Sequence, residues 1–70
     1  SNERETDRTN TITITDAIID AIDARYYDLG GDYCGRDSII AFARITLDDG
    51  FMGGVDDFID AVASDLRQND

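Results

Sequence analysis

Histidine and lysine are absent from this chain of 70 residues, and cysteine occurs once, as Cys34. One thiol cannot form an internal disulfide, and without histidine it leaves no ligand set of the zinc type. No glycine-rich phosphate loop follows a hydrophobic strand, and no histidine is present to activate the thiol. We therefore expect neither an enzyme nor a bound cofactor.

Long hydrophobic runs are also missing. The longest apolar run is far short of a membrane span, and no charged segment followed by an apolar one opens the chain. The sequence thus predicts a cytoplasmic protein without membrane contact. A core of this size rarely nets more than about 3–5 kcal/mol. Since disulfides and metals are not available, we expect association with a second copy to supply the missing stability.

Positive charge is scarce: six arginines face sixteen acids, for a formal net charge of −10. Residues 1–15 carry −1, residues 16–50 carry −5 and residues 51–70 carry −4. This balance suits solubility at very high salt, mimicry of nucleic acid toward a basic partner, or a well-solvated surface. Many aspartates without lysine are typical of halophilic proteins, but composition alone does not choose among the three.

The chain begins with residues 1–8, which contain no apolar residue and are expected to form a flexible arm. In the segment 9–15, Ile12 and Ile14 alternate with threonines, as in a strand that is buried on one face. Thr15 is then the expected N-cap of a helix, because its hydroxyl can accept a hydrogen bond from the first turn.

A first helix is predicted for residues 16–29, ended by a pair of glycines. Its apolar face would contain Ile18, Ile22, Tyr26 and Leu29, with Ile19 at the edge, and its opposite face would contain Asp16, Asp20 and Asp23. Aspartates three or four positions apart repel one another, so this acidic ridge is interpreted as solvated surface or as a phosphate mimic. Arg25 falls in the apolar arc, near enough to the helix end to reach the last carbonyl groups.

Residues 36–50 fit two periodicities. As a strand over 38–47, with a tight turn at Asp49-Gly50, the segment would pair with 9–15 in a right-handed βαβ unit of a small α/β or α+β domain. As a helix it would have Asp37 or Ser38 as N-cap, and Gly50 would end it in a left-handed conformation. The helical face would contain Ile39, Ile40, Ala43 and Leu47, flanked by Phe42.

A further amphipathic helix is predicted for residues 55–67 within the C-terminal segment 51–70. One side carries Val55, Ile59, Val62 and Leu66, joined by Phe58. This helix would complete a core, add an oligomer contact, or bind a protein partner after the hinge at Gly53-Gly54.

Three stretches, "TITIT", "DAIIDAIDARYYDL" and "GGDYCGRDSIIAFA", occur in the order strand, helix, turn and second helix. In this order the chain resembles the ribbon-helix-helix family of dimeric DNA-binding proteins over residues 9–49. Tyr33, Arg36, Asp37, Ile40 and Ala43 fit the family outline, whereas Gly35 stands where a hydroxyl residue is common and Ala41 where an arginine is common.

The resemblance implies a mostly α, β-α-α homodimer over residues 9–50, in which the strand pairs with its own copy and enters the major groove of double-stranded DNA. Thr9, Thr11 and Thr13 would face the bases. Arg8 would contact the backbone, as would Arg36 and Ser38 at the start of the second helix.

The predicted function is thus that of a homodimeric, sequence-specific transcriptional regulator, possible in strong salt, where distant aspartates repel DNA little. Two alternatives remain open from the residues. One is an acidic inhibitor or DNA mimic that binds a basic protein. The other is an antitoxin whose helix at 55–67 binds a toxin.

Overall fold

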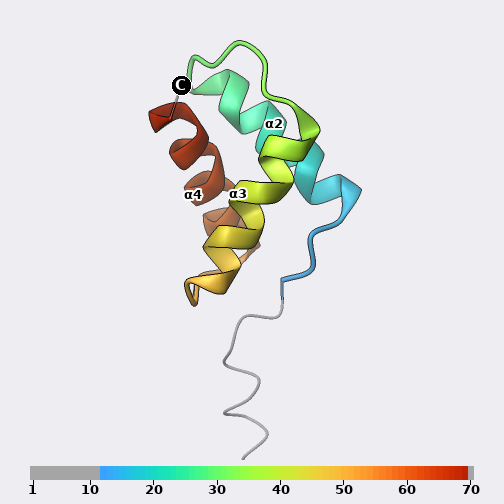
Figure 1. The fold of residues 1–70 in the computed structure, drawn as a ribbon, viewed down its shortest axis with the longest axis vertical. Helices are drawn as coiled ribbons and strands as arrows, with labels where there is room; N and C mark the ends of the chain where they lie inside the picture. The colour runs from blue at the N-terminus through green and yellow to red at the C-terminus, as the bar shows by residue number, and fades with distance from the viewer. Residues whose placement is uncertain (1–11, 70) are drawn as a thin grey trace, which may run out of the picture.

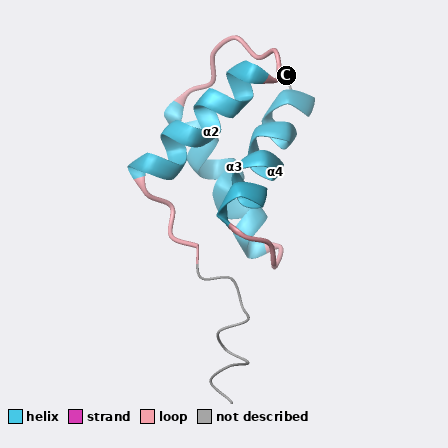
Figure 2. Cartoon of the chain, turned by 180° about the vertical axis from the view of Figure 1, so that it is seen from behind, coloured by secondary structure: helices cyan, strands magenta, loops and turns pink. Residues whose placement is uncertain are grey.

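The structure, a computed structural model, describes residues 12–69, and over that range it contains three α-helices and no strand. They are α2 (Asp16–Asp28), α3 (Arg36–Asp48) and α4 (Val55–Gln68). Figure 1 shows that α3 and α4 run in opposite directions, and that α4 brings the end of the chain back beside the end of α2. Seen from behind, every described segment between helices is a loop (Figure 2).

The predicted ribbon-helix-helix fold is therefore wrong, and so is the alternative with a strand at 38–47. Ile12, Thr13 and Ile14 form no strand, and residues 38–47 lie inside α3. The two isoleucines are half-buried and pack against the helical core, while Thr13 is exposed. Alternation over so few residues therefore fits an extended segment lying on a helical core as well as it fits a strand. Residues 1–11, which include the predicted arm and most of the predicted strand, lie outside the described residues.

Helix α2 begins as the sequence predicts. Thr15 is the N-cap, and its hydroxyl accepts a hydrogen bond from the backbone N–H of Ile18 at 3.2 Å. The buried residues of α2 are Ile19, Ile22 and Tyr26, so Ile19, predicted at the edge of the apolar face, lies within it. Leu29, expected on this face, follows the last helical residue and is 42% exposed, because the chain leaves the helix there through Gly30 at φ +100°.

Helix α3 confirms the helical interpretation of the ambiguous segment. Its predicted N-cap, Asp37 or Ser38, is wrong, because the helix begins at Arg36 and Gly35 is the N-cap, without a side-chain hydrogen bond. At its other end Gly50 has φ +87°, the left-handed conformation that glycine adopts most readily. The half-buried Phe51 follows, and its ring lies 5.5 Å from that of Phe58 in an edge-to-face arrangement.

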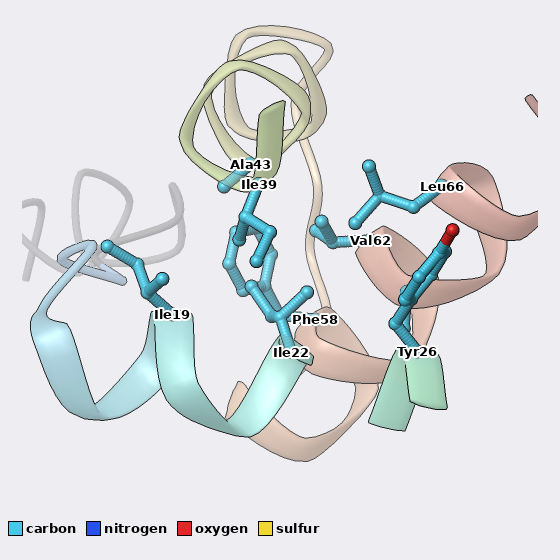
Figure 3. Packing of buried hydrophobic residues seen from close by; sticks show 9 residues of the cluster. Ile19, Ile22, Tyr26, Ile39, Ala43, Phe58, Val62 and Leu66 are labelled. Carbon is cyan, nitrogen blue, oxygen red and sulfur yellow. The ribbon is translucent and has the colours of Figure 1, made fainter. Parts of the chain in front are cut away.

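Helix α4 supplies the centre of the core. Nine residues form this core: Ile19, Ile22 and Tyr26 from α2, Ile39 and Ala43 from α3, and Phe58, Val62, Ala63 and Leu66 from α4. Figure 3 shows side chains of all three helices meeting around Ile22, Phe58 and Val62. A single chain thus buries its own apolar faces, and a partner strand is not needed for that purpose. None of the helices described is long and apolar enough to cross a membrane.

Candidate functional site

The residues predicted to bind DNA are divided among three places. Arg8, Thr9 and Thr11 lie outside the described residues. Thr13 is exposed in the segment before α2, and Arg36 and Ser38 are exposed in the first turn of α3. The first turn of α3 is the only one of these places where two of the predicted residues occur together in the described chain.

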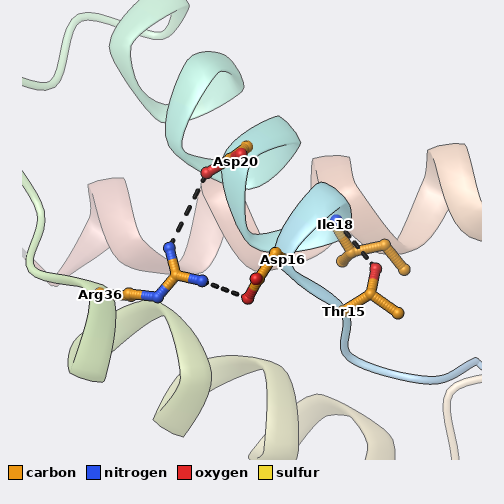
Figure 4. A network of polar contacts seen from close by, with 5 residues as sticks. All are labelled: Thr15, Asp16, Ile18, Asp20 and Arg36. Carbon is orange, nitrogen blue, oxygen red and sulfur yellow. Dashed lines mark hydrogen bonds and ion pairs between the residues drawn. The ribbon is translucent and has the colours of Figure 1, made fainter.

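Arg36 is engaged with the protein's own carboxylates. Its guanidinium donates a hydrogen bond to Asp16 Oδ1, and Nη1 lies 3.9 Å from Asp20 Oδ1 (Figure 4). Arg36 therefore joins the start of α3 to the first turns of α2. Two members of the predicted acidic ridge thus serve a contact between helices, which the helical periodicity of α2 alone does not indicate.

This pairing changes the charge that an incoming phosphate would meet at the start of α3. The positive end of a helix dipole favours an anion, and Arg36 would add to that attraction. Asp37 stands in the same first turn, however, and Asp16 and Asp20 accompany the guanidinium. Three carboxylates beside one guanidinium leave this end of α3 negative and unfavourable for a phosphate backbone.

The acidic surface extends over all three helices. Residues 12–69 contain twelve aspartates and four arginines, and every one of the twelve aspartates is exposed. Arg25 Nη1 donates a hydrogen bond to Asp60 Oδ1 at 2.7 Å, and Arg67 Nε donates to the carbonyl oxygen of Leu29 at 3.0 Å. Three of the four described arginines are thus directed at groups of this chain, whereas most of the aspartates face solvent without a cation.

The fourth arginine, Arg44, lies on the exposed side of α3, and its side chain has no hydrogen bond or ion pair with the rest of residues 12–69. Affinity for a nucleic-acid backbone depends on several arginines or lysines that neutralise phosphates. One unengaged arginine among twelve aspartates does not provide that, so the charge of the described chain opposes binding to a phosphate backbone.

The apolar face of α4, the helix predicted to bind a protein partner, is already buried in the core. Phe58, Val62, Ala63 and Leu66 are buried against the other two helices. What α4 presents to solvent is acidic, with Asp56, Asp57, Asp60 and Asp65 exposed. A partner that contacts α4 on the folded domain would therefore meet carboxylates rather than an apolar stripe.

Tyr33 is a candidate that sequence reasoning missed as a binding residue. Tyr33 is 82% exposed, the largest exposure among the big hydrophobic residues of the described chain. It lines two hollows, one of about 180 Å³ toward α2 and one of about 210 Å³ toward the C-terminal end of α4. An aromatic residue between two glycines of a connecting loop is the sequence signal that could have directed attention to it.

The sequence contains acids around Gly50 that could suggest a calcium loop, although their spacing does not match one. Over residues 12–69 no group of three or more cysteine, aspartate or glutamate side chains is placed to hold a metal ion. The segment 49–54 is a helix end followed by a helix start, as the sequence predicts.

No protein-family model matches this sequence, and neither a curated protein nor a solved structure shows significant similarity to it. The resemblance to ribbon-helix-helix proteins thus has only the quoted sequence pattern behind it. The functional argument depends on the geometry and charge of the chain itself.

Proposed function

We propose that this chain is a small helical binding domain that recognises a basic partner protein through its acidic surface. The observation that carries the proposal is the division of charge: all twelve described aspartates are exposed, while three of the four described arginines contact Asp16, Asp60 and Leu29 of this same chain. Such a surface attracts cationic partners and repels polyanions.

A preformed scaffold supports the same interpretation. The three helices bury a shared core of nine residues, so the aspartates stand on helices whose positions are set by packing. Carboxylates held on rigid elements lose less conformational freedom when a partner binds than carboxylates on a free tail. The domain would thus act by binding rather than by catalysis.

The proposal is tested with two fluorescent probes in anisotropy titrations, a labelled oligolysine and a labelled DNA duplex of mixed sequence. The titrations are performed at about 0.15 M KCl, where the Debye length is about 8 Å and diffuse attraction is already weakened. We expect saturable one-to-one binding of the oligolysine, weakened by added salt, and no binding of the duplex. An uncharged glycine-serine peptide of the same length is the control.

The same titration bears on the DNA-binding regulator predicted from the sequence, which stays a prediction. Saturable binding of the duplex without binding of the oligolysine would overturn the proposal made here. It would direct attention to Thr13 and to the predicted contacts within residues 1–11.

A further inference from the structure

The hollow between α2 and the loop 29–35 combines an apolar lining, exposed aspartates and an exposed aromatic ring. Its volume is about 180 Å³. The buried or half-buried part of its lining is apolar and consists of Ile19, Ile39 and Cys34. The exposed part consists of Asp20, Asp23, Tyr33 and Arg36. The hollow is named the Tyr33 groove below.

Arg36 does not make the Tyr33 groove cationic, because it already has partners. Its guanidinium is hydrogen-bonded to Asp16 and lies beside Asp20 (Figure 4). The carboxylate of Asp23, one turn further along α2, has no hydrogen bond or ion pair with other residues in the described range. One guanidinium against Asp16, Asp20 and Asp23 leaves this edge of the groove with an excess of negative charge.

Tyr33 offers an uncovered aromatic ring at the same groove. Tyr33 is 82% exposed and is not among the residues of the core or those packed against it. A cation over an aromatic face is attracted by the ring quadrupole, and arginine is found there more often than lysine. The guanidinium can also stack through its plane while its N–H groups reach a carboxylate, which the compact ammonium group of lysine does not do.

Given the proposed binding of a basic partner, we propose that the Tyr33 groove receives an arginine side chain of that partner. The guanidinium stacks on Tyr33 and donates hydrogen bonds to Asp23, and its methylene stem lies along the apolar lining at Ile19 and Ile39. The Arg36 guanidinium also lines the groove, but it is hydrogen-bonded to Asp16 and lies 3.9 Å from Asp20, so Asp23 is the carboxylate of the lining that has no arginine beside it. Charge complementarity and the exposed ring together select arginine as the occupant.

The test uses the full chain and a six-arginine peptide, with a six-lysine peptide for comparison, in NMR titrations at about 50 mM KCl, where exposed charges are weakly screened. We expect the largest amide shifts at Asp23, Tyr33 and Cys34. Asp23→Asn should weaken binding of the arginine peptide about threefold to fivefold, the range of an exposed ion pair. Asp48→Asn is the matched control, because it removes the same charge from the far end of α3 and should change binding by less than about twofold.

Tyrosine variants separate the ring from the charge. Tyr33→Leu should weaken the arginine peptide about threefold and the lysine peptide less, whereas Tyr33→Phe keeps the ring and should bind as the parent does. Asp23 and Tyr33 are both exposed, so the circular dichroism spectrum and melting temperature of each variant should match those of the parent chain.

Failure of the groove and failure of the proposed function give different results. If the peptides bind but Asp23→Asn equals Asp48→Asn, and Tyr33→Leu has no effect, the groove is not the site and the acidic surface alone accounts for binding. If neither peptide binds the parent chain, both proposals fall.

Discussion

Arg67 Nε donates a hydrogen bond to the carbonyl oxygen of Leu29 at 3.0 Å, so the last turn of α4 is joined to the residue that ends α2. The carbonyl groups at the end of a helix have no partner within the helix. A guanidinium is a suitable donor for them, because it also complements the negative end of the dipole. The contact closes the bundle at the end where Figure 1 places the C-terminus.

Loss of this contact should destabilise the fold. We expect Arg67→Met, which keeps much of the aliphatic stem, to lower the free energy of unfolding by about 1 kcal/mol, as for removal of one hydrogen bond. Urea denaturation followed by circular dichroism measures the change. Arg44→Met is the control and should shift stability by less than about 0.5 kcal/mol, because the Arg44 side chain makes no hydrogen bond or ion pair within residues 12–69. Equal effects of the two variants would contradict a specific role for Arg67.

Removal of residues 53–70 should abolish folding. Phe58, Val62, Ala63 and Leu66 would all be lost from the core, and α2 and α3 would each expose an apolar face. The far-ultraviolet circular dichroism spectrum of the truncated chain should show mostly unfolded protein. A truncated chain that keeps its helices and unfolds cooperatively would show instead that α4 is a separable partner-binding tail.

Gly31→Ala should be destabilising for a steric reason. A Cβ atom at this position would overlap the ring of Tyr26, which is buried in the core and cannot swing into solvent. Forcing extra atoms into a packed core costs about 1–3 kcal/mol, and the midpoint of urea denaturation should fall accordingly. The matched control is Gly35→Ala, where no atom lies within 4 Å of the added Cβ. Gly35 is the N-cap of α3, where alanine is less favourable than glycine, so there we expect a loss below about 1 kcal/mol and smaller than that of Gly31→Ala.

Salt should stabilise this chain. Twelve aspartates and four arginines in the described residues repel on balance, and screening of that repulsion favours the compact state. Between about 0.1 M and about 2 M KCl we expect the melting temperature to rise by roughly 5 °C, as for about 1 kcal/mol in a domain of this size. Differential scanning calorimetry at both concentrations measures the shift. A falling melting temperature would mean that the exposed ion pairs of Arg25 and Arg36 outweigh the repulsion.

Helices α2 and α4 were predictable because their signals are local, whereas residues 38–47 fitted both a helix and a strand. Thr15 precedes the apolar periodicity of α2 and caps it, and Gly50 followed by Phe51 marks the end of α3. The period of the C-terminal segment identifies α4 to within one residue of its observed end. Caps and periodic faces are encoded by a few neighbouring residues, so they can be recognised without knowledge of the tertiary structure.

The architecture was not predictable from those signals. Ile12 and Ile14 alternate with threonine, and no local feature distinguishes an extended segment lying on a core from a strand. The ribbon-helix-helix outline also makes α4 an addition to a two-helix unit, whereas Phe58 and Val62 are fully buried between the other helices. Whether a helix covers a core or extends from it depends on long-range packing.

The candidate site likewise combines features that the local sequence predicts with features that depend on tertiary structure. The exposure of Asp20 and Asp23 follows from the period of α2, but the pairing of Arg36 with Asp16 joins positions 20 residues apart. That pairing decides which aspartate remains without a cation. The exposed ring of Tyr33 likewise depends on the course of the loop 29–35, which the composition of the loop does not specify.

The three tyrosines lie in contrasting surroundings, and the chain has no tryptophan to dominate their emission. Tyr26 is buried against α4, whereas Tyr27 and Tyr33 are exposed. The intrinsic ultraviolet fluorescence of the protein therefore contains one reporter of the interior and two of the surface. Quenching by iodide or acrylamide can separate them, so unfolding and occupancy of the Tyr33 groove can be followed optically in the same unlabelled sample.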